Sequence, residues 1–296
     1  MLTRIDHVMI AVPDLSAGIA QYRKLGFDVY EGGVHPGKGT HNAIAFNRDD
    51  YIELIAIRDR AEFEAASSAS GSPDGGLAKF VQAGGGIRYV ALQSDDLAAD
   101  VVAMRSRGVA VNDPVEGSRR TPAGLELRWK VATLRAEHPL PIFFIEHVTP
   151  IDVRRSQLPR AGEHPNGVQW VERVYVVTND LEGTAAAYAH VLGVPQPEPH
   201  KGTVIMSDMC VFDIGPVGLC VARPYAEGPA SEALARRGPG VFQALCRTRS
   251  MEAAVNWMST QDLPPLARGT RSTGEQAMLA SPEIAGGTYL GFVGMA

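Results

Sequence analysis

The stretch that decides the fold is Ile5-Asp-His-Val-Met-Ile-Ala-Val12, which is followed by Pro13-Asp14 and by apolar residues at positions 15, 19 and 22. Its first eight residues form an apolar run rich in β-branched side chains, which predicts a strand. The spacing of the next apolar residues predicts an amphipathic helix that begins after an Asp14 N-cap and stops at Gly26. The stretch therefore predicts a strand that leads directly into a helix.

The same strand-and-helix pattern recurs three more times along the chain. Helices are expected to begin at four hydrophobic anchors, Leu15, Leu97, Leu181 and Met251. Successive anchors lie 82, 84 and 70 residues apart, and periodicity on this scale indicates one repeated structural unit. Two or three short apolar runs follow each helix, for example residues 204–206 and 217–221 in the third unit. We therefore expect an α+β fold made of four βαβββ modules.

The modules should pair, because the sheet of one module is too small to cover itself. The expected divisions are a first domain at 1–150, with modules at 1–60 and 86–148, and a second, degenerate pair of modules at 166–296. Residues 58–86 and 149–167 are rich in Gly, Ser, Pro or Arg and should be connections, with a short helix at 77–81.

Composition narrows the class of partner. The chain has 28 Lys and Arg against 33 Asp and Glu, a net charge of −5, so it has no basic footprint for nucleic acid or for an anionic membrane. No apolar stretch approaches the roughly 20 residues of a membrane span. Three cysteines without a C-x-x-C pair suit a reducing compartment. We expect a cytoplasmic protein with a small-molecule substrate. A homodimer stays open, since modules could pair within one chain or between two.

Strand alternation places two functional side chains in the concave face of the first module. Val8, Ile10 and Val12 form the more apolar face and should meet the helix, which leaves His7, with Ile5 on the same face, pointing into the concavity. Glu53 lies within the apolar run 51–57, where an unpaired carboxylate is costly. It therefore needs a cation, a metal or a proton.

Alignment of the helix anchors carries these two positions to the other modules. The equivalents of His7 are Tyr89, Arg173 and Gln243, and matching the closing strands sets Glu53 beside Glu146, Cys220 and Gly291. Only the first pair of modules then offers donors for a divalent ion. Arg119-Arg120 and Arg154-Arg155 are expected to be solvated charges.

The module order and the placement of His7 and Glu53 resemble the vicinal oxygen chelate superfamily. More narrowly, the chain resembles the glyoxalase-like domain group in six stretches: Ile5-Asp-His-Val8, Val12-Pro-Asp-Leu15, His35-Pro-Gly-Lys-Gly-Thr-His-Asn42, Tyr51-Ile-Glu-Leu-Ile-Ala56, Leu125-Glu-Leu-Arg-Trp129 and Leu140-Pro-Ile-Phe-Phe-Ile145. The resemblance covers residues 1–150. It implies two glyoxalase/extradiol-dioxygenase-like domains.

The resemblance also implies a divalent metal (Fe, Mn, Ni, Co or Zn) that is chelated by two adjacent oxygens of a substrate. His7, Glu53 and Glu146 inherit the ligand roles. Tyr89 stands where catalytic members often have a second His or Gln, and it is either a catalytic residue or a core tyrosine. Glu146 or Glu53 would transfer a proton, while His41 and Asn42 would contact the substrate. The implied function is a metal-dependent lyase, isomerase or hydrolase.

Two other functions stay open. An extradiol-type dioxygenase needs two His and one carboxylate on Fe(II), and would require His7 together with a second residue such as His41. A small-molecule binding or resistance protein would need no metal at all. Metal content and the effect of changing His7 distinguish these alternatives.

Overall fold

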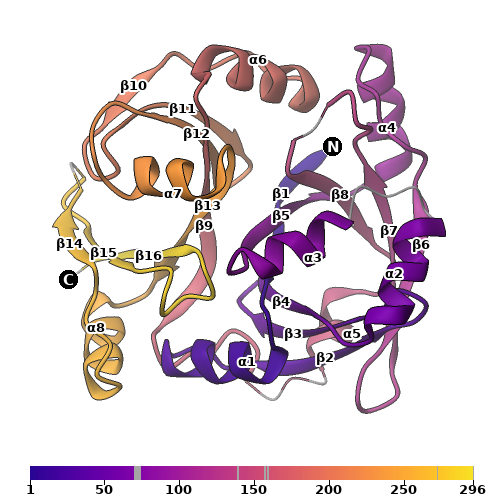
Figure 1. The fold of residues 1–296 in the computed structure, drawn as a ribbon, viewed down its shortest axis with the longest axis horizontal. Helices are drawn as coiled ribbons and strands as arrows, with labels where there is room; N and C mark the ends of the chain where they lie inside the picture. The colour runs from indigo at the N-terminus through magenta and orange to yellow at the C-terminus, as the bar shows by residue number, and fades with distance from the viewer. Residues whose placement is uncertain (70–74, 139, 157, 159, 272, 296) are drawn as a thin grey trace.

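A computed structural model of the chain describes residues 1–69, 75–138, 140–156, 158, 160–271 and 273–295. In this part of the chain two curved sheets of eight strands lie side by side (Figure 1). Residues 70–74 of the connection 58–86 lie outside the described residues. The α+β architecture of two paired sets of modules is confirmed.

The N-terminal sheet has the strand order β2-β3-β4-β1-β5-β8-β7-β6. Its strands are β1 Leu2–Ala11, β2 Tyr30–His35, β3 Thr40–Phe46, β4 Tyr51–Ile57, β5 Gly86–Ser94, β6 Val115–Arg120, β7 Glu126–Thr133 and β8 Ile142–His147. The second sheet repeats this order with β9 Val168–Val177, β10 His200–Gly202, β11 Ser207–Ile214, β12 Val217–Pro224, β13 Gly240–Thr248, β14 Ala267–Thr270, β15 Gln276–Ala280 and β16 Tyr289–Gly294. Each sheet therefore joins two modules through their first strands.

The four module helices begin at the four expected anchors. They are α1 Leu15–Lys24, α4 Leu97–Ser106, α6 Leu181–Leu192 and α8 Met251–Thr260. In each case the side chain before the anchor accepts a hydrogen bond from a backbone N–H of the first turn, through Asp14, Asp96, Asp180 and Ser250. The repeat in the sequence thus marks the start of every module helix.

Three further details differ from the expectation. The run 204–206 is a turn, and the strand of that module is β11, which begins one residue later. The short helix expected at 77–81 is α3, Gly75–Gln82, but α2, Arg60–Ala69, precedes it. Helices α5, Ile151–Arg155, and α7, Pro229–Arg237, lie in segments where no helix is expected from the sequence.

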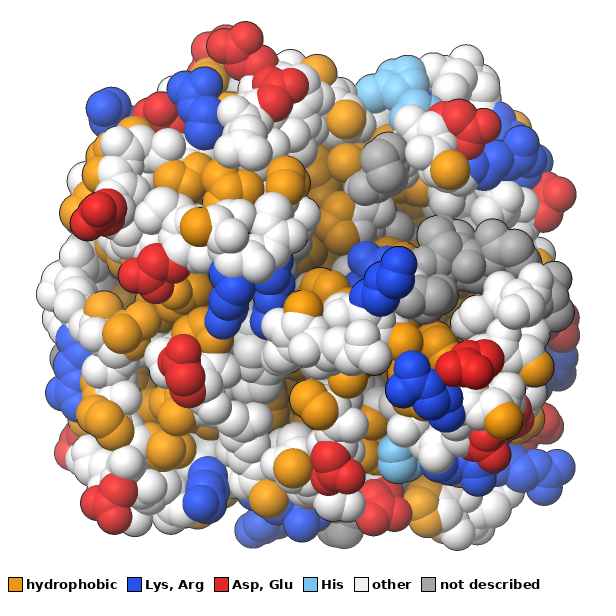
Figure 2. Space-filling view, in the orientation of Figure 1, with side chains coloured by type: hydrophobic (Ala, Val, Ile, Leu, Met, Phe, Trp, Pro, Cys, Tyr) orange, Lys and Arg blue, Asp and Glu red, His pale blue; other side chains and the backbone are white. Residues whose placement is uncertain are grey.

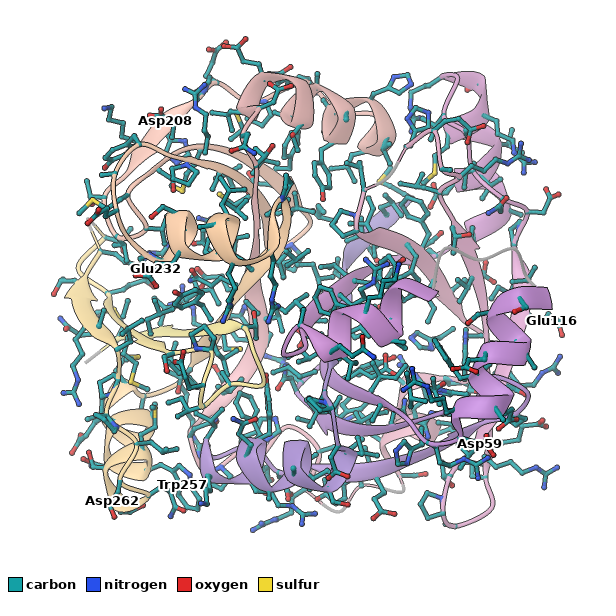
Figure 3. All side chains as sticks on the ribbon, viewed as in Figure 1. Asp59, Glu116, Asp208, Glu232, Trp257 and Asp262 are labelled. Carbon is teal, nitrogen blue, oxygen red and sulfur yellow. The ribbon has the colours of Figure 1, made fainter. Side chains whose placement is uncertain are left out.

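Helix α7 fills the concave side of the second sheet. Its Ala230 and Ala233 pack into a buried cluster with Tyr175, Phe242 and Tyr289 from the strands. Glu232 of α7 accepts a hydrogen bond from the Tyr289 hydroxyl at 2.5 Å and lies inside this sheet in Figure 3. The concave face of the second sheet is therefore occupied by the chain itself.

The two halves are held together through the helices on their convex sides. Trp257 of α8 donates a hydrogen bond from Nε1 to the backbone oxygen of Lys24 at the end of α1 (2.9 Å; Figure 3). Tyr22 donates to the backbone oxygen of Ala285 at 3.2 Å. The main hydrophobic cluster includes residues of both sheets, so the core is continuous across the molecule. None of the described helices is long and apolar enough to cross a membrane.

A buried polar chain ties the connection between the halves to the N-terminal sheet. The ring of His164 accepts at Nδ1 from the backbone N–H of Asp28 (2.9 Å) and lies 2.9 Å from Asn47 Oδ1 through Nε2. Asn47 donates to Asp50 (2.5 Å), and Asp50 also accepts from the backbone N–H of Val171. Because His164 is buried, its pKa falls to about 4, so the ring is neutral at pH 7.

We predict that this neutral His164 makes the protein acid-sensitive. The unfolded chain binds a proton near pH 6.5 and the folded chain only near pH 4, so stability is lost as the pH falls through this window. A His164→Gln variant keeps a donor to Asn47 but loses the acceptor for Asp28. It should be about 2 kcal/mol less stable than wild type at pH 7.5, and this gap should close by about pH 5.

Urea unfolding of both proteins at the two pH values measures the gap. The difference between wild type and the variant is measured, rather than the stability of wild type alone, because Asp50 also titrates. Burial raises the pKa of Asp50 to about 7, so its contribution to stability falls as the pH rises, in both proteins alike. His200→Gln, at an exposed histidine, is the control and should show no gap. A gap between wild type and His164→Gln that is constant with pH contradicts the prediction.

Candidate active site

The N-terminal sheet encloses a cavity of about 1680 Å³. Its edge strands β2 and β6 meet, and Arg119 of β6 donates a hydrogen bond from Nη1 to the backbone oxygen of Gly32 in β2. The walls are mostly apolar and aromatic, and they include Phe46, Tyr51, Tyr89, Trp129 and Phe143. Helices α2 and α3 add Phe63, Leu77 and Phe80 on the open side. We call this space the N-terminal cavity.

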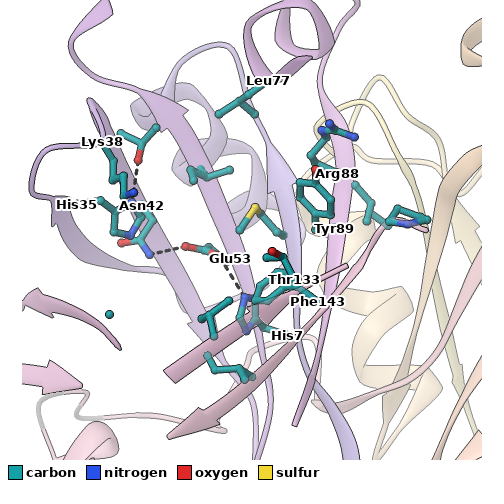
Figure 4. A pocket seen from close by; sticks show the side chains of 18 of the residues that line it. His7, His35, Lys38, Asn42, Glu53, Leu77, Arg88, Tyr89, Thr133 and Phe143 are labelled. Atoms are coloured by element: carbon teal, nitrogen blue, oxygen red, sulfur yellow. Dashed lines mark hydrogen bonds and ion pairs between the residues drawn. The ribbon is translucent and has the colours of Figure 1, made fainter. Parts of the chain in front are cut away.

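His7 and Glu53 meet on the floor of the N-terminal cavity (Figure 4). His7 Nε2 lies 3.4 Å from Glu53 Oε2, and both side chains are buried. Asn42 of β3 donates from Nδ2 to the other carboxylate oxygen at 2.6 Å. The His7 ring stacks on Tyr51 with centroids 4.5 Å apart, and Phe143 meets it edge-on at 5.4 Å. The imidazole is thus held in one orientation by rings on two sides.

A bulge in β1 brings a second carboxylate to His7. Opposite β5 the register shifts between Ile5 and His7, so that Asp6 has no partner in the ladder. Asp6 is completely buried, and its two oxygens lie 2.7 Å from His7 Nδ1 and 2.8 Å from His147 Nε2. The bulge also turns Ile5 into the main core, although alternation places it in the concavity.

The position of Asp6 decides which nitrogen of His7 is reactive. Burial raises the pKa of Asp6, but the charges and hydrogen bonds of His147 and His7 outweigh it, so the pKa lies well below its usual range. An ionised carboxylate only accepts hydrogen bonds, so His7 carries its proton on Nδ1. The lone pair of Nε2 then faces the carboxyl group of Glu53.

Glu146 does not reach this site. It lies on the opposite face of β8, where it accepts from Lys130 Nζ (2.7 Å) and from the backbone N–H of Leu97 at the start of α4 (2.9 Å). Those contacts outweigh its burial and lower its pKa. The expected facing of Glu146 and His147 is therefore wrong by one residue, because His147 lines the cavity.

The strand ladders show which residue corresponds to Glu53. Glu53 pairs with Met9, two residues after His7, and in the second module the residue paired with Ala91, two after Tyr89, is Phe143. The same rule gives Cys220 and Gly291 in the other modules, as expected from the sequence. The matching error is therefore confined to Glu146.

His41 also points away from the cavity. It alternates along β3 with Thr40 and Asn42, which line the cavity. Its pKa is lowered by burial and by Arg58, while Asp14 and Glu31 raise it. The two-histidine set that an iron dioxygenase would require from His7 and His41 is therefore not formed. Tyr89 does line the cavity, beside Phe143 at 6.2 Å between ring centroids.

The comparisons with known proteins bear on this fold. The family model described as "Glyoxalase-like domain" matches residues 5–192, well over half of the chain. The chain belongs to the glyoxalase-like domain family. This places it in the vicinal oxygen chelate superfamily, as the sequence motifs predict, and extends the match beyond residue 150. A search of curated proteins gave no match.

Solved structures share the glyoxalase-like fold over the whole chain. A hypothetical protein from Staphylococcus aureus superimposes with a TM-score of 0.66 at 14% identity, covering 100% of both chains. A mutant of 4-hydroxymandelate synthase from Streptomyces coelicolor gives 0.69 at 14% identity, over 99% of this chain and 92% of that one. A xylose isomerase-like TIM barrel/4-hydroxyphenylpyruvate dioxygenase fusion protein gives 0.61 at 12% identity, over 99% of this chain and 49% of that one.

The donors on the cavity floor do not make a usual metal site. The pseudo-twofold pairing of β1 and β5 brings His7 and Glu53 together with Tyr89 and Phe143, so only one module supplies ligands. Among the described residues no group of three or more His, Cys, Asp or Glu could hold an ion. Catalytic zinc and non-haem iron sites use at least three protein ligands. His7 and Glu53 therefore provide two of the three or more protein ligands that such a site uses.

Several cavity residues were missed in the sequence. Arg119 and Arg154, expected to be solvated, both line the cavity, and Arg154 is buried with Nη1 3.1 Å from His147 Nε2. His35 lines the cavity as well, with Nδ1 2.9 Å from the Thr40 hydroxyl and a pKa lowered mainly by burial. Nothing in a polar edge strand such as β6 marks one face as buried, so no signal could have found Arg119.

We predict that Gly32 is required to seat Asn42 against Glu53. A Cβ atom at Gly32 would collide with Asn42 Oδ1, a buried atom that has no hydrogen-bond partner among the described residues. Gly32→Ala should therefore lower the free energy of unfolding by about 1–3 kcal/mol through overpacking. Gly269→Ala is the matched control, because Gly269 also lies in a strand and has open space around it. Chemical denaturation of both variants checks this, and equal stabilities would contradict it.

Proposed function

We propose that this protein is a cytoplasmic enzyme that moves protons on carbon in a small substrate bound in the N-terminal cavity. His7 and Glu53 are the catalytic residues. The observation that carries the proposal is the line from Asp6 through His7 to Glu53, with 2.7 Å and 3.4 Å between the facing atoms. A base oriented by a buried carboxylate, with an acid beside it on a cavity floor, is the arrangement used in general acid–base catalysis.

In the proposed reaction His7 is the base, and Glu53 in its protonated form is the acid. His7 Nε2 accepts a proton from a carbon next to a carbonyl, and the electron pair of the broken C–H bond moves onto the carbonyl oxygen. Glu53 donates its proton to that oxygen, which gives an enol. When His7 then returns a proton to carbon, the enol oxygen gives its proton back to Glu53 and the carbonyl is restored; the carbon, or the face of the carbon, that receives the proton decides between isomerisation and epimerisation. Asp6 stabilises the imidazolium that forms in between.

The walls favour a substrate with an aromatic or apolar body. Tyr51, Phe46 and Phe143 surround the floor, while Arg119 and Arg154 provide positive charge for a carbonyl oxygen or an anion. Adjacent oxygens on the substrate, implied by the superfamily, suit this charge. The 2-oxo acid phenylpyruvate combines these features with an acidic C–H bond, and it serves as the probe.

We predict that the protein accelerates exchange of the C3 hydrogens of phenylpyruvate with D2O. A positioned base contributes about 10²–10⁴-fold, so His7→Gln should lose about that much of the protein-dependent rate. Glu53→Gln should be slowed as well, because it cannot release a proton. The exchange is followed by proton NMR at constant pD.

His200→Gln, which changes an exposed histidine far along the chain from His7, is the control and should exchange like wild type. Equal protein-dependent rates in wild type and His7→Gln would falsify the role of His7. Absence of any protein-dependent exchange with this and related 2-oxo acids would instead favour the binding-protein alternative.

We further predict that proton transfer proceeds without a resident metal. Protein purified without chelators and dialysed should retain less than about 0.1 equivalent of any divalent ion, since only two protein ligands converge. Elemental analysis measures this, and the exchange rate should be unchanged by EDTA. A full equivalent of metal that is lost in His7→Gln, with exchange abolished by EDTA, would establish the metal-dependent route.

A further inference from the structure

The N-terminal cavity continues beyond its floor to the junction with the second half of the molecule. Its lining there includes Val177, Arg237, Val241, Phe242 and Gly287. With about 1680 Å³, it exceeds the roughly 300–1,000 Å³ of typical small-ligand pockets. Figure 2 shows a furrow with hydrophobic side chains between the two halves and Lys or Arg side chains near the centre of that face. The cavity is therefore long enough for more than a two- or three-carbon substrate.

A continuous series of rings and guanidinium groups connects the floor to this junction. Phe143 lies 5.4 Å from His7 and 6.2 Å from Tyr89, measured between ring centroids. Arg88 then lies over Tyr89 at 4.5 Å and over Phe80 at 5.7 Å. Arg237 also lies over the Phe80 ring, at 5.1 Å from its centroid. We call this series the aromatic track; its members all line the cavity (Figure 4 shows its floor end).

Arg237 is the last member of the aromatic track, and its positive charge has no acidic partner among the described residues. Among the described residues it forms no hydrogen bond or ion pair, and its Nε is buried without a partner. Its guanidinium lies against the backbone of Gly86 and Gly287, where any side chain would collide with it. Burial first, and then the charge of Arg236, lowers the pKa of Arg237 to about 10, which still leaves it charged at pH 7.

The local electrostatics at the junction favour an anion. The acidic residues that line the cavity, Glu31, Glu53 and Glu116, belong to strands of the N-terminal sheet, whereas the lining contributed by residues 233–242 includes two arginines and no acid. A guanidinium offers two parallel N–H donors to a carboxylate, which is a strong and specific pairing. A partly buried cation without an acid therefore matches a carboxylate on a ligand.

We propose that the N-terminal cavity binds an elongated ligand whose apolar or aromatic body lies along the aromatic track and whose terminal carboxylate is held by Arg237. This inference rests on the proposed function in that the other end of the ligand lies at His7 and Glu53. It assigns the substrate class as long-chain or aryl-alkyl carboxylic acids. It also assigns Arg237, contributed by the second half of the chain, as a specificity-determining residue.

The test measures binding rather than turnover. The probes are ω-phenylalkanoates with chains of three to twelve carbons and their matched neutral amides, titrated against the full-length protein by calorimetry. Wild type should prefer the longer carboxylates to their amides by tenfold or more, with little preference for the shortest acids. Arg237→Gln should abolish that preference and leave amide affinity within threefold, while Arg237→Lys, which keeps the charge but loses the two parallel donors, should retain only part of it.

Three controls separate the outcomes. Arg223→Gln, at an exposed arginine paired with Asp208, should bind like wild type. His7→Gln should keep the carboxylate preference even though it loses proton exchange, so failure of the proposed function is distinguishable. A wild type without a carboxylate preference at any length overturns the inference, and so does a preference that is lost in Arg119→Gln but not in Arg237→Gln. The comparison of carboxylates with amides in wild type does not depend on the folding of any variant.

Discussion

Strand β1 pairs in parallel with β4 on one side and antiparallel with β5 on the other, and this central pairing places the residues on the floor of the N-terminal cavity. The antiparallel contact relates the two modules by a pseudo-twofold axis, so that residue 7 of one module and residue 89 of the other face the same space. The parallel contact sets Glu53 beside the strand of His7. His7 and Glu53 could not meet in an isolated strand, and Tyr89 reaches the same space only because the second module pairs with the first.

The two halves pair their strands in the same order and differ in which helices cover the concave face of the sheet. In the second sheet α7 lies in the concavity and buries it with Ala230, Ala233 and the surrounding rings. In the first sheet the helices at the same point of the module order, α2 and α3, rest on the rim through Phe63 and Leu77. The first concavity therefore remains open for a ligand. The second half contributes the core that supports it and the arginine at its far end.

The repeat made most of this fold predictable. Four capped helices at fixed spacing and a strand before each of them follow from local physics, namely apolar periodicity and side-chain capping. Local physics does not decide which face of the sheet each side chain occupies in the strands that follow the helices, because a register shift of one residue moves every side chain to the other face. In β8 both Glu146 and His147 are polar, and only pairing with β7 and the cap on α4 decide which one turns inward.

Long-range contacts explain why the positions of the other site residues could not be predicted from the sequence. The bulge at Asp6 exists only because β5 runs past β1 with a shifted register, so the sequence Ile5-Asp-His7 gives no sign that both polar residues are buried together. His41 and Asn42 are adjacent, and their facing depends on the register between β3 and β4. Arg237 looks like an ordinary basic residue at the end of a helix, where cations are favoured in any case. Only the approach of the second half to α3 makes it part of a cavity.

The bulge recurs in the second half, and the comparison shows what burial of a carboxylate requires. There the residue at the position of Asp6 is Glu172, which lies in the shifted register between β9 and β13 and pairs with Arg247 and Arg271. Permanent cations neutralise that acid, so it holds no titrating partner. Asp6 instead contacts two histidines, His7 at 2.7 Å and His147 at 2.8 Å. The same backbone irregularity thus yields a fixed ion-pair cluster in one sheet. In the other it yields an ionised carboxylate that orients the His7 imidazole through Nδ1, and this arrangement suits the proton transfer proposed for the N-terminal site.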